Sequence, residues 1–373
     1  MKDNYRAERT GGLNARAASR SAVIAALIVL ALLDPTAVAE AARQSCRVWA
    51  ESVMPTLFPF VTMSLMLVSG LGSLGLPNKT LTALSVALGM MGGSPSGARL
   101  LAQLRNQSGG LSRRAAQCAA ACVTTASPMF ILATLTGWLG SGRDTGLIML
   151  AAHELAAILA GLVCLSWTRR WTKTDPLPDY STRDSSRDSI NPAQAAQMKP
   201  LSLGEAIAQA ASAMLAMCGC MALFNAALTV AIARITLPPR AVVIIAAALE
   251  MTGGCARIGA MNLPAATAAP MMCAAVTFGS ASVFMQNAAY LSTIGVRLSI
   301  QAAARVTAGA LAWALCSAMM GNPAGWIAAA CVLAAAAIPA IPDKSTNVKE
   351  ARPAPGQTRQ ARAPAAFTSD PAY

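Results

Sequence analysis

The chain has one histidine and few charged residues, and both scarcities exclude familiar classes of protein. Only 12% of its 373 residues are charged, about half of the ~25% usual in soluble domains. The single histidine, His153, leaves most zinc sites and Ser-His-Asp triads without the parts they need. The sequence also lacks a G-x-x-x-x-G-K-[ST] motif and an H-E-x-x-H motif, so neither a P-loop nor a zinc protease is indicated.

The few charges are concentrated in three segments. Residues 1–20, 169–204 and 343–373 hold 25 of the 45 Lys, Arg, Asp and Glu residues. The other 286 residues carry only 20 charges, too few to cover a surface that faces water. The hydrophobic fraction of 55% and the mean hydropathy of +0.50 therefore predict a polytopic membrane protein.

The net charge of +13 does not indicate nucleic acid. A protein that binds nucleic acid gathers Lys and Arg on one folded face, whereas here they lie in tails and in short loops between apolar runs. That distribution is the positive-inside bias of membrane proteins. The expected partners are the lipid bilayer, a small polar solute with a coupling cation or proton, and a second copy of the chain in a homo-oligomer.

The ten cysteines do not suggest a disulfide framework. Cys118 and Cys122 are four residues apart on a helical pattern, but no His or acidic residue is near them in sequence. We expect no metal and no cofactor. Six others lie in apolar segments, where a thiol behaves as a small hydrophobe: Cys164, Cys218, Cys220, Cys273, Cys316 and Cys331.

Long apolar segments predict an all-α fold with about eight transmembrane helices. Two further segments, 81–104 and 241–261, are interrupted by glycine-rich sequences at 92–97 and 250–254. Unpaired backbone groups are tolerated at bilayer depth only where protein or a polar cavity satisfies them. The eight spans are expected at residues 21–42, 50–71, 115–139, 146–167, 205–235, 263–294, 298–320 and 322–341.

The amino-terminal apolar run has two interpretations. Residues 1–20 are basic, residues 22–33 are apolar, and Ala37-Val38-Ala39 resembles a signal-peptidase site. One interpretation is a cleaved signal peptide. We favour the other, a signal anchor that remains as the first helix with a kink at Asp34-Pro35, because a polytopic chain inserts without cleavage.

Positive charges favour two re-entrant hairpins at the broken segments. If the amino terminus is inside, the inside segments carry five, three, six, one and five Lys or Arg residues, and the outside loops hold only scattered ones such as Arg143, Arg234, Arg240 and Arg257. A full crossing of the first broken segment would place Arg105, Arg113 and Arg114 outside. The bias therefore predicts that both termini are cytoplasmic. The inside segments are 1–20, 103–114, 169–204, 295–297 and 342–373.

The same order of segments occurs twice. Residues 50–168 and 205–320 each run as helix, broken hairpin, interrupted helix and helix. The first helices of the two parts are expected to run in opposite directions, which predicts inverted repeats, a common plan of secondary transporters. The resulting organisation is a basic amino terminus (1–20), a first membrane half (21–168), a cytoplasmic linker (169–204), a second membrane half (205–342) and a disordered tail (343–373).

Several short motifs occur in the order found in a known family. They are Met54-Pro55-Thr56-Leu57-Phe58-Pro59-Phe60, Gly93-Ser94-Pro95-Ser96-Gly97-Ala98, Ser127-Pro128-Met129-Phe130, Glu250-Met251-Thr252-Gly253-Gly254 and Phe278-Gly279-Ser280 with Gln286 downstream. The chain resembles the YlbJ-type sporulation integral membrane proteins over about residues 20–320. The resemblance implies a bacterial cell-membrane protein of spore formers, linked to spore cortex formation. It also implies the nucleoside-recognition or Gate domain, with a transport activity that is not assigned.

The breaks and interruptions supply the candidate substrate-binding residues. Half-helix amino termini suit anions or hydroxyl groups, and these segments are expected to converge near the bilayer midplane. The competing interpretation is that the glycines only allow close helix packing. The candidates are Gly92, Gly93, Ser94, Pro95, Ser96, Gly97, Ser127, Pro128, Glu250, Thr252, Gly253, Gly254, Gln286 and Asn287.

Glu250 is the most informative candidate. A carboxylate inside an apolar run is costly and indicates function, while the alternative is a structural ion pair with Arg257. Gln286 and Asn287 could bind a nucleobase or sugar, or could join helices. His153 and Glu154 point about 100° apart on a helix, so a neutral His153 bonded to a carbonyl is favoured over a proton relay.

Two functions fit these features. One is a transporter or permease for a small polar solute, and the other is a non-transporting scaffold for assembly of the spore envelope. An enzyme is not expected, because Ser127 and Ser282 have no base partner in the sequence.

Overall fold

The computed structural model describes residues 21–337, except for 23–24, 27, 30, 73–77, 109–110, 170–199 and 234–235. All described residues belong to one unit, Met1–Ala340. The expectations for the basic amino terminus, the tail and most of the 169–204 linker concern residues outside this part, as does Arg234.

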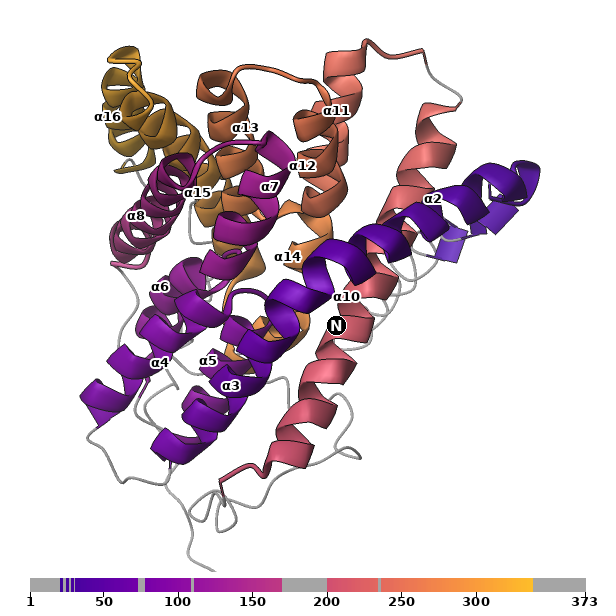
Figure 1. The fold of residues 1–373 in the computed structure, drawn as a ribbon. Coiled ribbons are helices and arrows are strands. Elements are labelled where there is room, and N and C mark those ends of the chain that lie inside the picture. Colours follow the sequence, from indigo (N-terminus) through magenta and orange to yellow (C-terminus); the bar gives the residue numbers. More distant parts are fainter. Residues whose placement is uncertain are drawn as a thin grey trace, which may run out of the picture. The chain divides into compact units, whose positions relative to one another are not determined.

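Every regular element in the described part of the chain is a helix, as expected for an all-α polytopic membrane protein (Figure 1). Five helical stretches there are long and apolar enough to cross a membrane, fewer than the eight spans expected. The described helix in the last expected span, Ala324–Ala337, is 14 residues long, and the 115–139 segment is divided by a break. The five stretches are Pro35–Leu67, Arg143–Trp167, Leu203–Ile232, Ala265–Ile294 and Leu298–Met319.

The first two expected spans are not separated by a loop. Helix α2 (Pro35–Val48) continues through one π-helical turn, η1 (Trp49–Val53), into α3 (Met54–Gly72). The Asp34 side chain accepts a hydrogen bond from the Ala37 amide at 3.1 Å, so it caps the start of α2. Residues 43–49 contain charge but neither glycine nor proline. The expected loop between the spans 21–42 and 50–71 is therefore wrong, because charge alone does not end a helix.

Helix α10 (Leu203–Ile232) lies antiparallel to the joined α2–α3 helix (Figure 1). The Asn225 Nδ2 atom donates to the Ala41 carbonyl at 3.1 Å near one end. At the other end, the Leu201 amide donates to Ser69 Oγ at 3.0 Å. As residue numbers rise in one helix they fall in the other, so the opposite directions expected for these two helices are confirmed.

Two helical hairpins follow these helices, one in each half. The first is α4 (Asn78–Gly92) and α5 (Ser96–Ser108), which turn at residues 93–95. The second is α11 (Pro239–Leu249) and α12 (Met251–Ala260), which turn at Glu250 alone. Gly253 and Gly254 therefore lie inside α12 and not in the break, contrary to expectation. A Cβ atom at Gly254 would collide with the Ala247 backbone, so this glycine allows α11 and α12 to approach closely.

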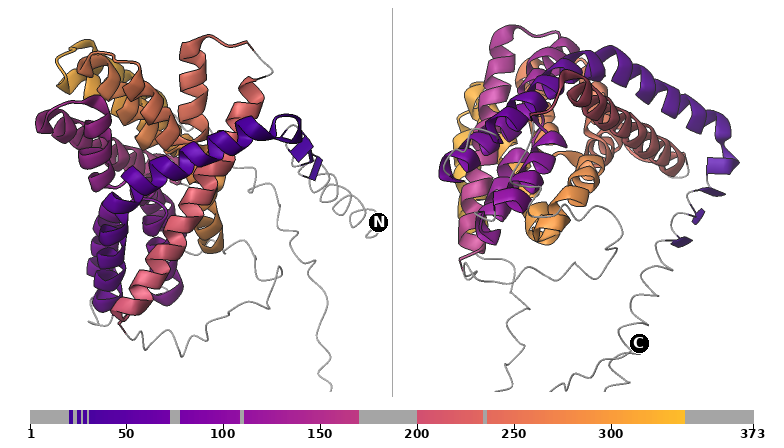
Figure 2. Two further views of the ribbon diagram at one scale, coloured as in Figure 1. Left: turned by 45° about the vertical axis from the view of Figure 1, so that its right-hand side comes forward. Right: turned by 90° about the horizontal axis from the view of Figure 1, so that it is seen from below.

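Interrupted helices and a final long helix complete each half (Figure 2). In the first half, α6 (Arg113–Val123) ends before residues 124–127, then η2 (Phe130–Leu135) and α7 (Thr136–Leu139) precede α8 (Arg143–Trp167). In the second half, α13 (Ala265–Phe278) breaks at Gly279, which has a φ of +83°. There α14 (Ser280–Leu291), η3 (Ser292–Ile294) and α15 (Leu298–Met319) follow. Helix α16 (Ala324–Ala337) packs against α15 and α8.

The interior is built from small side chains on α8, α13 and α15. Ala152 and Ala156 of α8, Ala269 of α13, and Ala308 and Ala312 of α15 are almost fully buried. Small residues let helix backbones approach closely where lipid removes the hydrophobic driving force. The core therefore lies where α8, α13 and α15 meet.

Candidate functional site

The first break meets the first interruption and the second half. The Ser94 amide donates to the Thr125 carbonyl at 2.7 Å, and the Asn287 Nδ2 atom on α14 donates to Ser94 Oγ at 2.9 Å. The structure thus joins Ser94 to Asn287, two candidates that are 193 residues apart in sequence. The Asn287 Oδ1 atom is buried without a hydrogen-bond partner among the described residues.

This meeting point is densely packed. Gly93 has a φ of +65°, and a Cβ atom there would lie 2.6 Å from the Ser127 amide nitrogen. A Cβ atom at Gly97 would collide with the Val123 carbonyl oxygen. Gly93 and Gly97 therefore allow close backbone approach at this point. Ser127 and the half-buried Pro128 begin the next helical segment, where the Ser127 hydroxyl accepts from the Phe130 amide at 3.3 Å.

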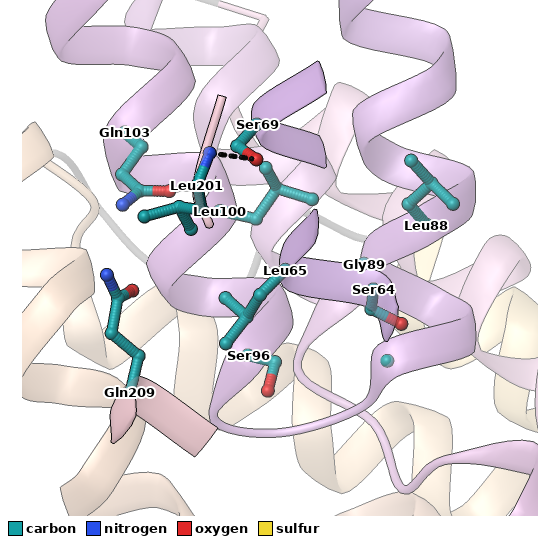
Figure 3. Close-up of a pocket in the computed structure, with 11 residues that line it drawn as sticks. Ser64, Leu65, Ser69, Leu88, Gly89, Ser96, Leu100, Gln103, Leu201 and Gln209 are labelled. Carbon is teal, nitrogen blue, oxygen red and sulfur yellow. Dashed lines mark hydrogen bonds between the residues drawn. The ribbon is translucent and has the colours of Figure 1, made fainter. Parts of the chain in front are cut away.

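A cavity of about 100 Å³ lies beside the first break, between α3, α4, α5 and α10 (Figure 3). The candidates Gly92 and Ser96 line it, while Pro95 does not. One edge of the cavity is closed by the hydrogen bond between the Leu201 amide and Ser69 Oγ, drawn as a dashed line in Figure 3. Leu65, Leu88 and Leu100 also line it, so this cavity is only partly polar.

His153 is held from two sides in the centre of the fold. It is fully buried, with Nδ1 at 2.7 Å from Thr277 Oγ1 and Nε2 at 3.2 Å from the Ala126 carbonyl. A neutral imidazole with its proton on Nε2 donates to the Ala126 carbonyl. The single proton of the Thr277 hydroxyl then goes either to Nδ1 or to the Cys273 carbonyl, which lies 2.6 Å from Thr277 Oγ1. The contact with a carbonyl agrees with the expectation for His153. One carboxylate oxygen of the neighbouring Glu154 is buried without a partner in the described region.

Arg305 on α15 has the corresponding place in the second half. It is 3% exposed, and its guanidinium donates to the Ala121 carbonyl at 3.0 Å and to the Phe278 carbonyl at 3.3 Å. These carbonyls lie near the carboxyl ends of α6 and α13, where partial negative charge accumulates. The buried cation is therefore stabilised by two helix ends.

His153 and Arg305 show the repeat at atomic scale. Each reaches a carbonyl 27 residues earlier in its own half, Ala126 and Phe278 respectively. Each also contacts a threonine of the other half: His153 contacts Thr277, and Arg305 Nη1 lies 3.4 Å from Thr124 Oγ1. This exchange of partners is what two antiparallel repeats produce.

Glu250 caps helix α12. It is 6% exposed, and its Oε1 and Oε2 atoms accept hydrogen bonds from the Thr252 amide at 3.0 Å and the Gly253 amide at 2.6 Å. The expected structural alternative, a direct ion pair with Arg257, does not form: the ion pair among the described residues joins Arg43 to Glu40. Thr252 and Gly253 therefore contribute backbone amides that hold the Glu250 carboxylate in place.

A second cavity, of about 140 Å³, opens beside Glu250. It lies between α2, α10 and α12, and Arg257 and Asn225 bring a guanidinium and an amide to it. Gln286 is not part of its lining; its Nε2 atom donates to Ser282 Oγ at 3.4 Å on the same helix. The lining residues are Gln44, Ser45, Val48, Met221, Asn225, Glu250, Gly253, Ala256, Arg257 and Ala260.

Sequence reasoning missed Arg305 and Asn225. Arg305 is a charged residue inside an apolar run. The argument made for Glu250, that such a charge indicates function or a partner, applies to it equally. Asn225 had no comparable signal, because its importance depends on α2 lying beside α10. In the described part of the chain, no three His, Cys, Asp or Glu side chains are grouped so that they could hold a metal ion.

These features define an all-α polytopic membrane protein with antiparallel halves and a charged cavity at one helix break. The chain is similar to the sporulation integral membrane protein YlbJ of Bacillus subtilis (strain 168), with 28% identity over 220 residues. The aligned region covers 53% of each protein, so the chain spans about half the length of this curated relative. No family model matches the chain. No solved structure matches it. The similarity and the apolar helices together support a location in the membrane.

Proposed function

We propose that the chain is a multi-pass transporter or permease for a small polar solute, with a role in sporulation. The observation that carries this proposal is the cavity at the second helix break, which both Glu250 and Arg257 line. Charged groups in membrane-spanning regions are costly and typically mark solute or ion pathways. The sporulation role comes from the similarity to the sporulation integral membrane protein YlbJ.

The position of the two cavities supports a pathway. Both lie against α10, one at Gln209 and the other at Asn225. Sixteen residues of helix separate these positions by about 24 Å, most of the ~30 Å thickness of the hydrocarbon core. Each cavity touches the turn of a different hairpin. Transporters built from inverted repeats with broken helices commonly alternate access between the two sides of the membrane.

Uptake by liposomes that contain the purified full chain tests the proposal. The panel includes nucleosides, because the motifs resemble Gate-domain proteins, together with amino acids, metal ions and peptidoglycan precursors. We expect saturable uptake of at least one solute, lost in Glu250→Gln and retained in the matched surface variant Glu40→Gln. Uptake no faster than in empty liposomes across the panel would contradict a transporter.

The second candidate is a scaffold for assembly of the spore envelope. It is favoured by the dense packing at the first break, where Gly93 and Gly97 leave no space for a solute. A scaffold keeps its partners when the charged cavity is disabled. A Glu250→Gln/Arg257→Gln double variant that still supports sporulation in a Bacillus subtilis strain lacking YlbJ, while the wild-type chain transports nothing, would favour this role.

A further inference from the structure

Two opposite charges face the second cavity without pairing. Glu250 Oε2 lies 3.3 Å, and Arg257 Nη1 lies 3.4 Å, from the position that a Cβ atom would take at Gly253. The two charged groups therefore lie close together beside Gly253. They are more than 4.0 Å apart, since they form no ion pair. The absent side chain at Gly253 leaves space between them.

The carboxylate is fixed in place. Two backbone amides at the start of α12 hold Glu250 by one oxygen each. A carboxylate oxygen has more than one acceptor position, so each oxygen can accept a further hydrogen bond from the cavity. The fixed geometry lowers the entropy that a ligand would lose by ordering this side chain.

The guanidinium keeps unused donors. Arg257 donates to the Gly253 carbonyl and to Asn225 Oδ1, both at 3.4 Å. A guanidinium has five N–H donors, and the others have no hydrogen-bond partner among the described residues. Its planar fork matches the two oxygens of a carboxylate.

The space fits a small solute. The cavity of about 140 Å³ corresponds to roughly five water molecules, since each water occupies about 30 Å³ in the liquid. Its wall also includes the apolar side chains of Val48, Met221 and Ala256. Gln44, another lining residue, is exposed. The cavity thus presents an anionic and a cationic group close together, with apolar side chains beside them.

We infer that this cavity binds a small zwitterion of the α-amino-acid class, with its carboxylate on Arg257 and its ammonium group on Glu250. A simple anion would leave Glu250 facing like charge, and a simple cation would leave Arg257 without a partner. A zwitterion provides a partner of opposite charge for Glu250 and for Arg257 at the same time. The inference names the solute class for the proposed transporter and rests on that proposal for its role, while binding itself is a separate property.

Equilibrium binding to the full chain in lipid nanodiscs tests the inference. The probes are the proteinogenic L-amino acids and D-alanine, with acetate, ethylammonium and inorganic phosphate as probes that carry charge of one sign. We expect at least one amino acid to bind saturably, and each probe of one charge sign to bind at least about tenfold more weakly, which corresponds to 1.4 kcal/mol. No amino acid binding, or phosphate binding as tightly as the best amino acid, would overturn the inference.

Three variants separate the charges from the space. Glu250→Gln and Arg257→Gln should each weaken amino-acid binding by at least about tenfold. Gly253→Ala keeps both charges but puts a methyl group between them, and it should weaken binding while α12 stays folded, because alanine favours a helix. Glu40 is exposed on α2. Glu40→Gln is the control and should bind amino acids like the wild type. If Gly253→Ala binds amino acids as tightly as the wild type, the ligand does not lie beside Gly253 and the inference is overturned. This outcome does not depend on whether the two charge variants fold.

Failure of the zwitterion site and failure of the proposed transporter give different results. Nucleoside uptake without amino-acid binding would overturn the zwitterion and leave the transporter. Amino-acid binding without uptake in liposomes would leave the zwitterion site and overturn the transporter.

Discussion

The Arg305 guanidinium lies at the carboxyl ends of α6 and α13. Replacing it with Met removes charge-assisted hydrogen bonds to the Ala121 and Phe278 carbonyls, each worth about 1.5–3 kcal/mol. The substitution also removes the desolvation penalty of a buried charge, so we expect Arg305→Met to lower the free energy of unfolding by about 2–4 kcal/mol, measured as a lower thermal unfolding temperature in detergent. Arg240 is exposed, and Arg240→Met should unfold like the wild type. Equal unfolding temperatures for the Arg305 variant and the wild type would show that the two helix ends do not depend on this charge.

At the scale of elements, the glycines of the first hairpin are tested by a matched pair. Gly97 on α5 faces the Val123 carbonyl, whereas a Cβ atom at Gly219 on α10 would meet nothing within 4 Å. Alanine in a helix interior is favoured over glycine by about 1 kcal/mol. We therefore expect Gly219→Ala to keep or slightly raise thermal stability, and Gly97→Ala to lower it because the hairpin must move away from α6. Equal stability of the two variants would contradict the close packing.

The pairing of α2 with α10 is tested by two thiols. Cys46 Sγ and Cys218 Sγ lie 3.7 Å apart. With a protease site inserted between residues 180 and 190, a copper–phenanthroline oxidant should remove two electrons and two protons from these thiols and form a disulfide. The two fragments should then remain joined on a non-reducing gel after cleavage. Cys46→Ala should abolish the join, and fragments that separate in the wild type would contradict the antiparallel pairing.

How far the elements could be predicted depends on the kind of signal. The order of helix, hairpin, interrupted helix and helix follows from glycine and proline breaks in apolar runs, and it is confirmed in both halves. The α2–α3 junction was not predictable from charge, because Arg43 and Arg47 lie on an exposed helical face. The contact of Asn225 with Ala41 was not predictable either, because it depends on the register of two helices 184 residues apart. Ser94 and Asn287 were each identified, but only the fold shows that they bond to each other.

At the scale of the whole molecule, the hairpins determine which loops share a side. If the first hairpin enters and leaves on one side, Arg105, Arg113 and Arg114 face the cytoplasm, as the positive-inside bias requires. We expect single cysteines at these positions, in a background without native thiols, to resist an impermeant maleimide added to intact cells. A cysteine at Arg143 should react in the same assay. Labelling of the three positions from outside would contradict a re-entrant hairpin.

The length of α10 affects the surrounding lipid. Residues 206–233 contain no charged side chain, and as a helix they extend about 42 Å, well beyond the ~30 Å of a typical hydrocarbon core. To keep this stretch out of water, the helix must incline by roughly 45° or the bilayer must thicken around it. Because α2–α3 runs beside it, both helices share this mismatch. The chain should therefore be sensitive to acyl-chain length, and longer lipids should raise its thermal stability while shorter ones lower it.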